Sequence, residues 1–116
     1  MIKDQLIYVA HPFGGNKANK YSIDTIMENL AMLDKNNTYL SPLHNFSMLY
    51  FDTQYSKGLK ICLDMLNKCD ALVLCGDWET SKGCIGEWSF AIAKGMPIYT
   101  WKEWTDKLKE QGDNSR

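Results

Sequence analysis

The chain has 116 residues, enough for one domain with a hydrophobic core of its own and too few for two. Its 45% apolar and 23% charged residues are typical of a globular protein, and a formal net charge of −1 leaves no broad basic face for DNA or RNA. No run approaches the roughly 20 apolar residues that span a bilayer, and the N-terminal residues carry no signal peptide. We therefore expect a cytoplasmic protein that binds neither a membrane nor a nucleic acid polymer.

The first half of the chain predicts a strand, a helix and a short second strand. Residues 5–10 form an apolar run that is typical of a buried strand, and residues 38–40 form a second, brief strand. Between them, apolar residues recur at the spacing of one helix face, and Ser22 or Asn19 is expected to cap this helix. The residues on this face are Ile23, Ile26, Met27, Leu30 and Leu33.

The second half predicts two further strands among three helices. The run 70–76 shows no polar alternation, so we expect a central strand that is covered on both faces. A helix over about residues 54–68 precedes it. The aromatic-rich segment 42–53 has no periodicity and is expected to pack on the core or on a ligand. The remaining elements are a loop over 76–83, a helix from about 84 to 94, a strand over 96–99 and a helix from about 102.

Strands that alternate with helices predict a parallel sheet with helices on both faces. The expected fold class is therefore α/β, as one Rossmann-like (flavodoxin-like) domain over residues 1–110 with about four to five strands. Residues 111–116 are expected to form a disordered tail. The four cysteines include no CxxC pair and the chain has only two histidines, so we interpret the cysteines as reduced and buried and expect no zinc site.

Two segments are expected to meet at the carboxyl ends of the strands, where open parallel sheets bind ligands. Residues 11–16 follow the first strand and residues 76–83 follow the central strand. Their glycines allow a ligand to approach the backbone, and amides at a helix start attract anions. Neither segment contains a named phosphate motif, so a polar connection with a helix cap is an equally good explanation of the second one. The candidate ligand-binding residues are His11, Pro12, Phe13, Gly14, Asp52, Gly76, Trp78, Ser81, Lys82 and Gly83.

Glu87 is the candidate catalytic residue. The expected helix boundary places it in the first turn, facing the strand ends, where a carboxylate can attack a sugar carbon. A first-turn glutamate that only stabilises the helix dipole is the simpler alternative. Glycosidic chemistry usually uses a second carboxyl group, for which Asp77 and Asp52 are candidates. The aromatic residues near these loops, which could stack on a nucleobase or pack in the core, are Phe13, Tyr50, Phe51, Trp78 and Trp88.

Four segments together resemble the nucleoside 2-deoxyribosyltransferase-like superfamily. They are residues 7–12 (IYVAHP), 69–74 (CDALVL), 76–87 (GDWETSKGCIGE) and 91–98 (AIAKGMPI). The likeness spans about residues 5–100, and more narrowly it is similar to a branch of small phage and prophage proteins. If the protein is encoded by a phage, as this likeness implies, its expected location is the cytoplasm of the host cell.

This resemblance implies a protein that cleaves or transfers the N-glycosidic bond of a nucleoside or nucleotide. By position, Glu87 would attack the anomeric carbon and form a covalent deoxyribosyl intermediate, which water or a second base would then resolve. The resemblance implies no metal or redox cofactor. It also implies a homo-oligomer, for which the apolar loop Leu43–Phe51 is the candidate contact.

The sequence departs from the enzymes of this superfamily at two places. Cys62 stands eight positions before Asp70, where the enzymes usually carry an acidic residue, and the loop before Glu87 is longer and contains Trp78. An alternative therefore stays open, in which the protein binds a nucleotide-derived signal of the ADP-ribose type in a phage-defence context without turning it over. A structural or adaptor domain, the third alternative, would bind no small molecule.

Overall fold

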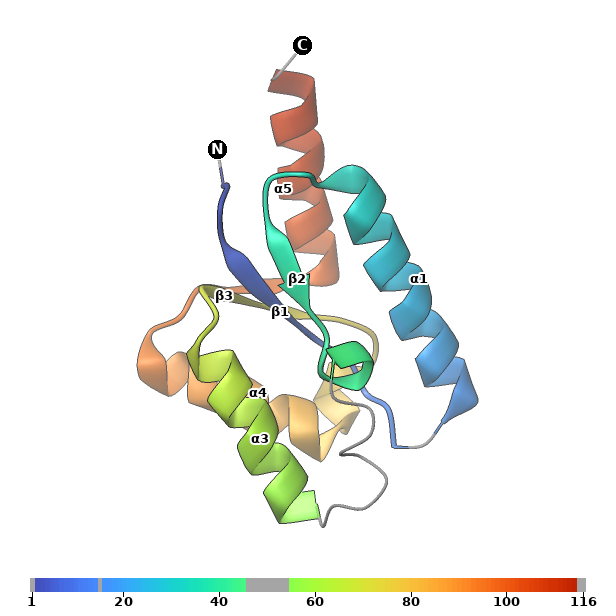
Figure 1. The fold of residues 1–116 in the computed structure, drawn as a ribbon, viewed down its shortest axis with the longest axis vertical. Helices are drawn as coiled ribbons and strands as arrows, with labels where there is room; N and C mark the ends of the chain where they lie inside the picture. Colours follow the sequence, from blue (N-terminus) through green and yellow to red (C-terminus); the bar gives the residue numbers. More distant parts are fainter. Residues whose placement is uncertain (1, 15, 46–54, 115–116) are drawn as a thin grey trace.

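The computed structural model describes residues 2–14, 16–45 and 55–114 (Figure 1). Strands and helices alternate in the order that the sequence predicts, and residues 42–45 add one helical turn after the second strand. The elements are β1 (Leu6–Ala10), α1 (Lys17–Leu33), β2 (Thr38–Leu40), α3 (Tyr55–Asn67), β3 (Ala71–Leu74), the 3-10 turn η1 (Trp78–Thr80), α4 (Lys82–Lys94), β4 (Ile98–Thr100) and α5 (Trp101–Asn114).

The four strands form one parallel sheet in the order β2-β1-β3-β4. Strands β1 and β3 are therefore interior, and they pair from Ile7 opposite Ala71 to Ala10 opposite Leu74. All four residues of β3 are buried, so the prediction of a central strand covered on both faces is confirmed.

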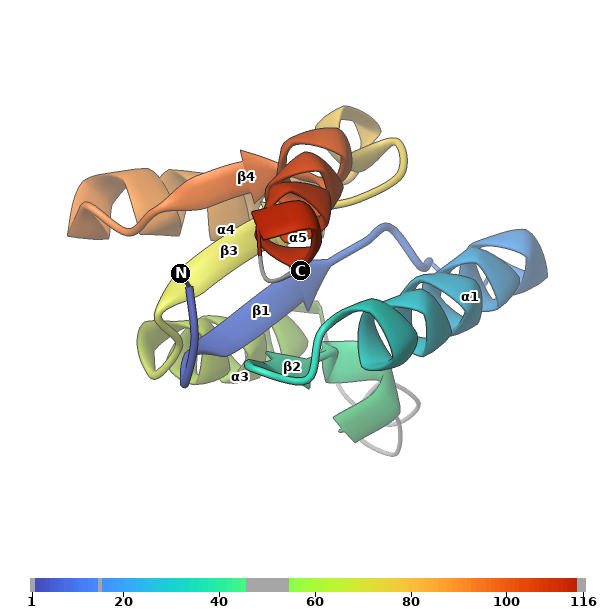
Figure 2. The ribbon, with the colours of Figure 1, turned by 90° about the horizontal axis from the view of Figure 1, so that it is seen from above.

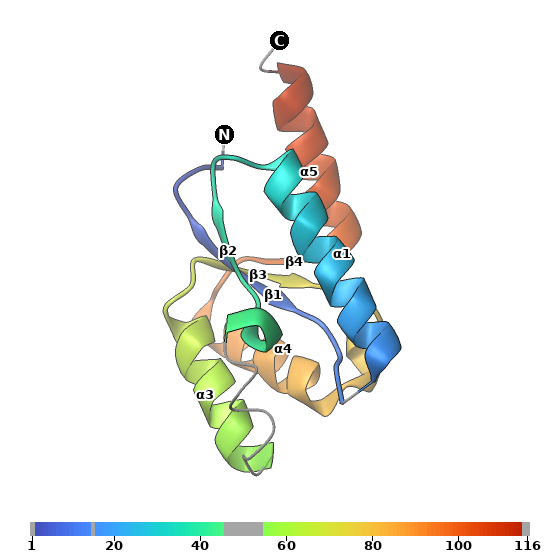
Figure 3. The ribbon, with the colours of Figure 1, turned by 45° about the vertical axis from the view of Figure 1, so that its right-hand side comes forward.

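Helices cover both faces of the sheet, as predicted for this α/β fold. Side chains alternate along a strand, so Tyr8 and Leu72 face the core formed with α3 and α4, whereas Ile7 and Val73 face the core formed with α1 and α5. Figures 1 and 3 show α3 and α4 together below the sheet, with α1 and α5 on its other side. Viewed from above in Figure 2, α5 lies in front of the strands and α1 extends to the right of β1. The second core is centred on Trp104, which is fully buried.

Helix α1 begins earlier than its apolar periodicity indicates. Its N-cap is Asn16, whose side-chain oxygen accepts hydrogen bonds from the backbone N–H groups of Ala18 and Asn19. The expected caps, Ser22 and Asn19, are wrong because both lie inside the helix. Leu33 is 51% exposed at the last turn, whereas the other apolar residues of the predicted face are buried or half-buried.

Helix α4 also begins before the predicted boundary. Ser81 caps it by accepting a hydrogen bond from the Cys84 backbone N–H, so the first helical residue is Lys82. The helix ends as predicted at Gly95, which has a φ of 76° in the left-handed region that favours glycine. Glu87 therefore lies in the second turn, not in the first, and the helix dipole explains little of its setting.

All four cysteines are free and buried, which confirms their interpretation as reduced apolar residues. Helix α5 continues to Asn114, so residues 111–114 of the expected tail are helical, and residues 115 and 116 lie outside the described part. Across residues 2–14, 16–45 and 55–114, no helix has the length and apolar character needed to cross a membrane.

Candidate functional site

The site is built around a buried hydrogen bond between two residues that are far apart in the sequence. Tyr8, in the middle of β1, is fully buried, and its hydroxyl donates a hydrogen bond to Oε2 of Glu87. Glu87 is only 6% exposed, because the second turn of α4 points it at the sheet. The carboxylate therefore lies between α4 and β1, beneath the sheet.

The Glu87 carboxylate accepts the Tyr8 hydrogen bond through Oε2. Among the described residues, no buried side-chain nitrogen or oxygen lacks a hydrogen-bond partner. Solvent reaches only 6% of the Glu87 surface.

Burial sets the protonation of this pair. It raises the pKa of Glu87 to about 7, although the hydrogen bond from Tyr8 lowers that pKa in part. Burial also raises the pKa of Tyr8 far above its ordinary value, and the neighbouring Glu87 and Cys62 raise it further. Tyr8 therefore remains a hydrogen-bond donor, and Glu87 changes between the acid and the carboxylate near neutral pH.

Two cysteines complete the surroundings of this pair. Cys62, which departs from the acidic residue of the superfamily enzymes, lies on α3 close enough to interact with the Tyr8 hydroxyl. Cys84 lies one turn before Glu87 on α4, and burial raises the pKa of its thiol to about 12. The hydrogen bond from Tyr8 therefore offsets the cost of the buried charge only in part.

The structure brings the two predicted loops into direct contact at the carboxyl ends of β1 and β3. His11 follows β1, and its Nδ1–H donates to the carbonyl oxygen of Pro12, 2.7 Å away, while Nε2 lies 2.8 Å from Oγ of Ser22. A Cβ atom at Gly76 would lie 2.7 Å from Nε2 of His11. Gly76 also has a φ of 61°, so this position requires glycine for two reasons.

The other residues of the second predicted loop have mixed roles. Ser81 acts as the helix cap, which is the alternative that the sequence left open. Trp78 is half-buried and packs against Trp88, with 5.9 Å between ring centroids and 43° between ring planes. Asp77 and Lys82 are exposed, and Gly83 is half-buried inside the first turn of α4.

In the first predicted loop, Pro12 and Phe13 are half-buried and Gly14 is exposed, with a φ of 54°. The Phe13 carbonyl oxygen accepts a hydrogen bond from the Asn16 backbone N–H, so this loop leads directly into the cap of α1. Three predicted residues lie outside the described part of the chain. They are Asp52, Tyr50 and Phe51.

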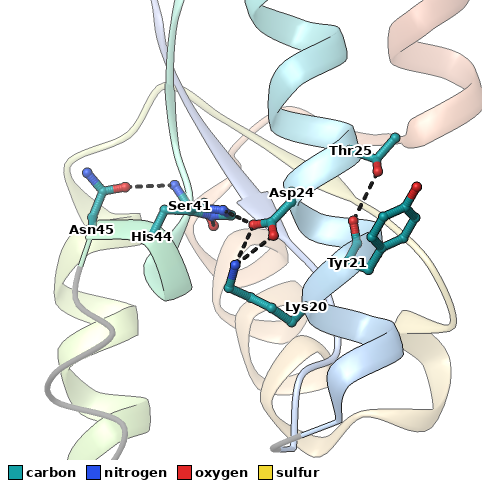
Figure 4. A network of polar contacts seen from close by, with 7 residues as sticks. All are labelled: Lys20, Tyr21, Asp24, Thr25, Ser41, His44 and Asn45. Atoms are coloured by element: carbon teal, nitrogen blue, oxygen red, sulfur yellow. Dashed lines mark hydrogen bonds and ion pairs between the residues drawn. The ribbon is translucent and has the colours of Figure 1, made fainter.

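A second polar network, which the sequence does not reveal, joins residues 42–45 to α1 (Figure 4). The two ring nitrogens of His44 lie 2.9 Å from Oγ of Ser41 and 2.6 Å from Oδ1 of Asp24, and Lys20 contacts the same carboxylate at 2.6 Å. Lys20 and His44 lower the pKa of Asp24. His44 is exposed, and its ring reaches across to Asp24 on α1. Ser41 is only 1% exposed, so its hydroxyl is shielded from solvent.

In the described ranges, no three His, Cys, Asp or Glu side chains are arranged to hold a metal ion.

Tyr8 is the residue of the site that sequence reasoning did not single out. A tyrosine inside an otherwise apolar strand signals a buried hydroxyl that needs a partner. Residues 7–10 show this pattern, but the pattern does not indicate which residue accepts the hydrogen bond from the Tyr8 hydroxyl.

A family profile described as "Domain of unknown function (DUF4406)" matches residues 5–100. The chain belongs to this family. The match covers the span over which the sequence resembles the deoxyribosyltransferase-like superfamily, while the narrower likeness to phage proteins stays a prediction. Among curated proteins, no match to the chain is found.

Solved structures show the same fold in larger proteins. A 2-deoxyribosyltransferase from Leishmania mexicana superposes with a TM-score of 0.60 at 24% identity, over 83% of this chain and 63% of the other. A conserved protein from Enterococcus faecalis V583 gives 0.69 at 23%, over 83% and 62%. A 2-deoxyribosyltransferase from Bacillus psychrosaccharolyticus gives 0.63 at 21%, over 82% and 70%. The DUF4406 chain thus shares the fold of 2-deoxyribosyltransferases and spans less than two thirds of the length of the first two proteins.

Proposed function

We propose that this DUF4406 protein cleaves or transfers the N-glycosidic bond of a nucleoside or nucleotide, with Glu87 as the nucleophile. The observation that supports this proposal most directly is the buried Glu87 carboxylate, held by Tyr8 and ionising near pH 7, within a fold shared with 2-deoxyribosyltransferases. A poorly solvated carboxylate is a stronger nucleophile than one in bulk water, and half of it is ionised near neutral pH.

In the first step, an oxygen of the Glu87 carboxylate attacks the anomeric carbon. The new carbon–oxygen bond forms as the carbon–nitrogen bond breaks, and the electron pair of that bond leaves with the base, which takes a proton. In the second step, a water molecule or another base attacks the same carbon and loses its proton. The ester bond then breaks, and Glu87 is restored as a carboxylate.

Tyr8 acts as a positioning residue in this scheme. Its hydroxyl donates a hydrogen bond to Oε2, which fixes the orientation of the carboxylate and stabilises the ionised form of Glu87. Asp77, which is exposed at the start of η1, is the candidate that protonates the departing base. Asp52, predicted in the ligand site, has no described position.

The other predicted ligand residues supply contacts for a nucleotide. Gly76 and His11 bring the two loops together, and the exposed ammonium of Lys82 lies at the start of α4, where the helix N–H groups favour an anion. Trp78 and Phe13 offer flat surfaces for a base. Pro12, Gly14, Ser81 and Gly83 shape the same loops.

Binding of a nucleotide-derived signal without turnover is the second candidate. It is favoured by the small exposed fraction of Glu87, 6%, and by Cys62 beside Tyr8 in place of a carboxylate. In this case Glu87 would position Tyr8 and the β1 loop, and a nucleotide of the ADP-ribose type would stay intact.

One experiment separates these candidates. Wild-type protein, Glu87→Gln and the matched control Glu28→Gln, which changes an exposed glutamate on α1, are incubated with nucleosides, deoxynucleotides, NAD and cyclic ADP-ribose isomers. Mass spectrometry measures free base and retained ligand, and intact-protein spectra detect a sugar ester.

Free base from wild type and Glu28→Gln, with none from Glu87→Gln, supports the enzyme. Loss of the sugar ester in Glu87→Gln assigns the nucleophile. An intact ligand retained by all three proteins, with no free base, contradicts catalysis and supports the binder.

A further inference from the structure

Helix α1 contributes a serine hydroxyl to the loop that follows β1. Ser22 lies in the second turn of α1 and is half-buried. A hydroxyl inside a helix often bonds the carbonyl oxygen one turn earlier, as Thr25 does with Tyr21 at 3.0 Å. The Ser22 hydroxyl has its partner on a different segment, because its Oγ lies 2.8 Å from Nε2 of His11.

The second ring nitrogen of His11 determines the direction of this hydrogen bond. Nδ1 lies 2.7 Å from the carbonyl oxygen of Pro12, and a carbonyl oxygen can only accept. Nδ1 therefore carries the proton, and Nε2 of the neutral ring is left as an acceptor. The Ser22 hydroxyl donates to it. The arrangement is thus a potential nucleophile bonded to a base, with the tautomer of the base fixed by a third group.

Gly76 restricts where the His11 ring can lie. A Cβ atom at this glycine would be 2.7 Å from Nε2, so the loop after β3 approaches the ring as closely as its backbone allows. The pair stands at the carboxyl ends of parallel strands, where such sheets bind ligands. Because His11 and Ser22 are half-buried, the pair is partly shielded from bulk water and is still open to a small molecule.

A second serine–histidine pair in the chain shows why access matters. The ring of His44 lies between Ser41 and Asp24, as Figure 4 shows. Ser41 is only 1% exposed, so a substrate cannot reach its hydroxyl. The sequence has two histidines, and His11 is the one that holds a serine within reach of a substrate.

We propose that Ser22 is a nucleophile activated by His11, and that this pair hydrolyses a small carboxylic ester. Oγ of Ser22 attacks the carbonyl carbon as its proton passes to Nε2 of His11. The ester bond to the alcohol breaks, and the alcohol leaves with the proton from Nε2, so that Ser22 carries the acyl group.

Water completes the reaction. It attacks the acyl carbon and gives a proton to Nε2, the bond from that carbon to Oγ breaks, and Oγ regains the proton as the carboxylic acid leaves. This inference does not rest on the proposed function, because neither Glu87 nor a nucleoside takes part in it.

A fluorophosphonate probe tests the nucleophile directly, because it forms a stable bond to an activated serine with loss of fluoride. We expect wild-type protein to be labelled at Ser22, as located by peptide mass spectrometry, and Ser22→Ala to stay unlabelled. This substitution is mild, since alanine suits a helix interior. Ser89→Ala is the matched control, because it removes an exposed serine on α4 and should be labelled like the wild type.

Replacing the base tests the role of His11. A positioned base contributes about 100- to 10,000-fold, so His11→Gln should slow both labelling and the hydrolysis of p-nitrophenyl acetate by at least about 100-fold. Circular dichroism checks the fold of each variant, and His11→Asn takes the place of His11→Gln if the latter does not fold. An unlabelled wild-type protein, a label that persists in Ser22→Ala, or a labelling rate that the loss of the imidazole leaves unchanged would overturn the proposal.

Discussion

Replacing Glu87 with glutamine should change how the stability of the protein depends on pH. The unfolded chain loses the Glu87 proton at the ordinary pKa of 4.5, whereas the folded protein holds it until about pH 7. Between these values the folded state binds more protons, so the free energy of unfolding falls as pH rises. Above the folded pKa, the full cost of burying the charge is present.

The structure gives the size of this effect. The two pKa values differ by about two and a half pH units, and each unit corresponds to about 1.4 kcal/mol, so ionised Glu87 costs about 3 kcal/mol above neutral pH. Glutamine has nearly the same shape and accepts the Tyr8 hydrogen bond through its carbonyl oxygen, but it carries no proton to lose. Relative to Glu87→Gln, wild-type protein should therefore lose about 3 kcal/mol between about pH 4 and pH 8.

Urea unfolding of both proteins, followed by tryptophan fluorescence at a series of pH values, measures this difference. Contributions from all other titrating groups cancel when the two curves are subtracted. A difference that stays constant with pH, or that changes only around the ordinary pKa of a glutamate, would show that the Glu87 carboxylate is solvated and would refute the reasoning.

The remaining predictions concern the partners of this site. Tyr8→Phe removes the donor that lowers the pKa of Glu87, so that pKa should rise above about 7 and stability at about pH 8 should fall by about 1.5–3 kcal/mol, as measured by the same pH series. An unchanged transition would contradict the hydrogen bond. Gly76→Ala should destabilise the fold by about 1–3 kcal/mol, because a Cβ would meet His11 and the backbone has a positive φ. Gly14→Ala is the control, since its φ is also positive but nothing lies within 4 Å, and equal losses in thermal unfolding would exclude the His11 contact.

The sequence predicts the elements of this fold better than their ends. Residues 71–74 are all apolar, and this pattern predicts a buried central strand. The start of α4 is different, because Lys82 and Gly83 add nothing to the apolar periodicity and only the Ser81 cap marks the boundary. An error of two residues there was enough to move Glu87 from the second turn to the first.

The sequence predicts where the candidate site lies better than it predicts which residues contact one another there. The carboxyl ends of β1 and β3 follow from topology, which correctly brings His11 and Gly76 together. The bond between Tyr8 and Glu87 joins residues 79 positions apart, and no local pattern specifies such a pair. For the same reason the contact between His44 and Asp24, 20 positions apart, could not be anticipated.

The position of β1 inside the sheet has a consequence for synthesis on the ribosome. This first strand needs β3 as its inner neighbour, and the contact between Leu6 and Asp70 closes a separation of 64 residues. A nascent chain that has emerged only through β2 therefore exposes one long side of β1, with unpaired N–H and C=O groups and no α3 or α4 to cover Tyr8. Pairing between strands that are far apart in the sequence, such as β1 and β3, forms slowly. The nascent chain must therefore avoid aggregation through β1 until most of the protein has been translated.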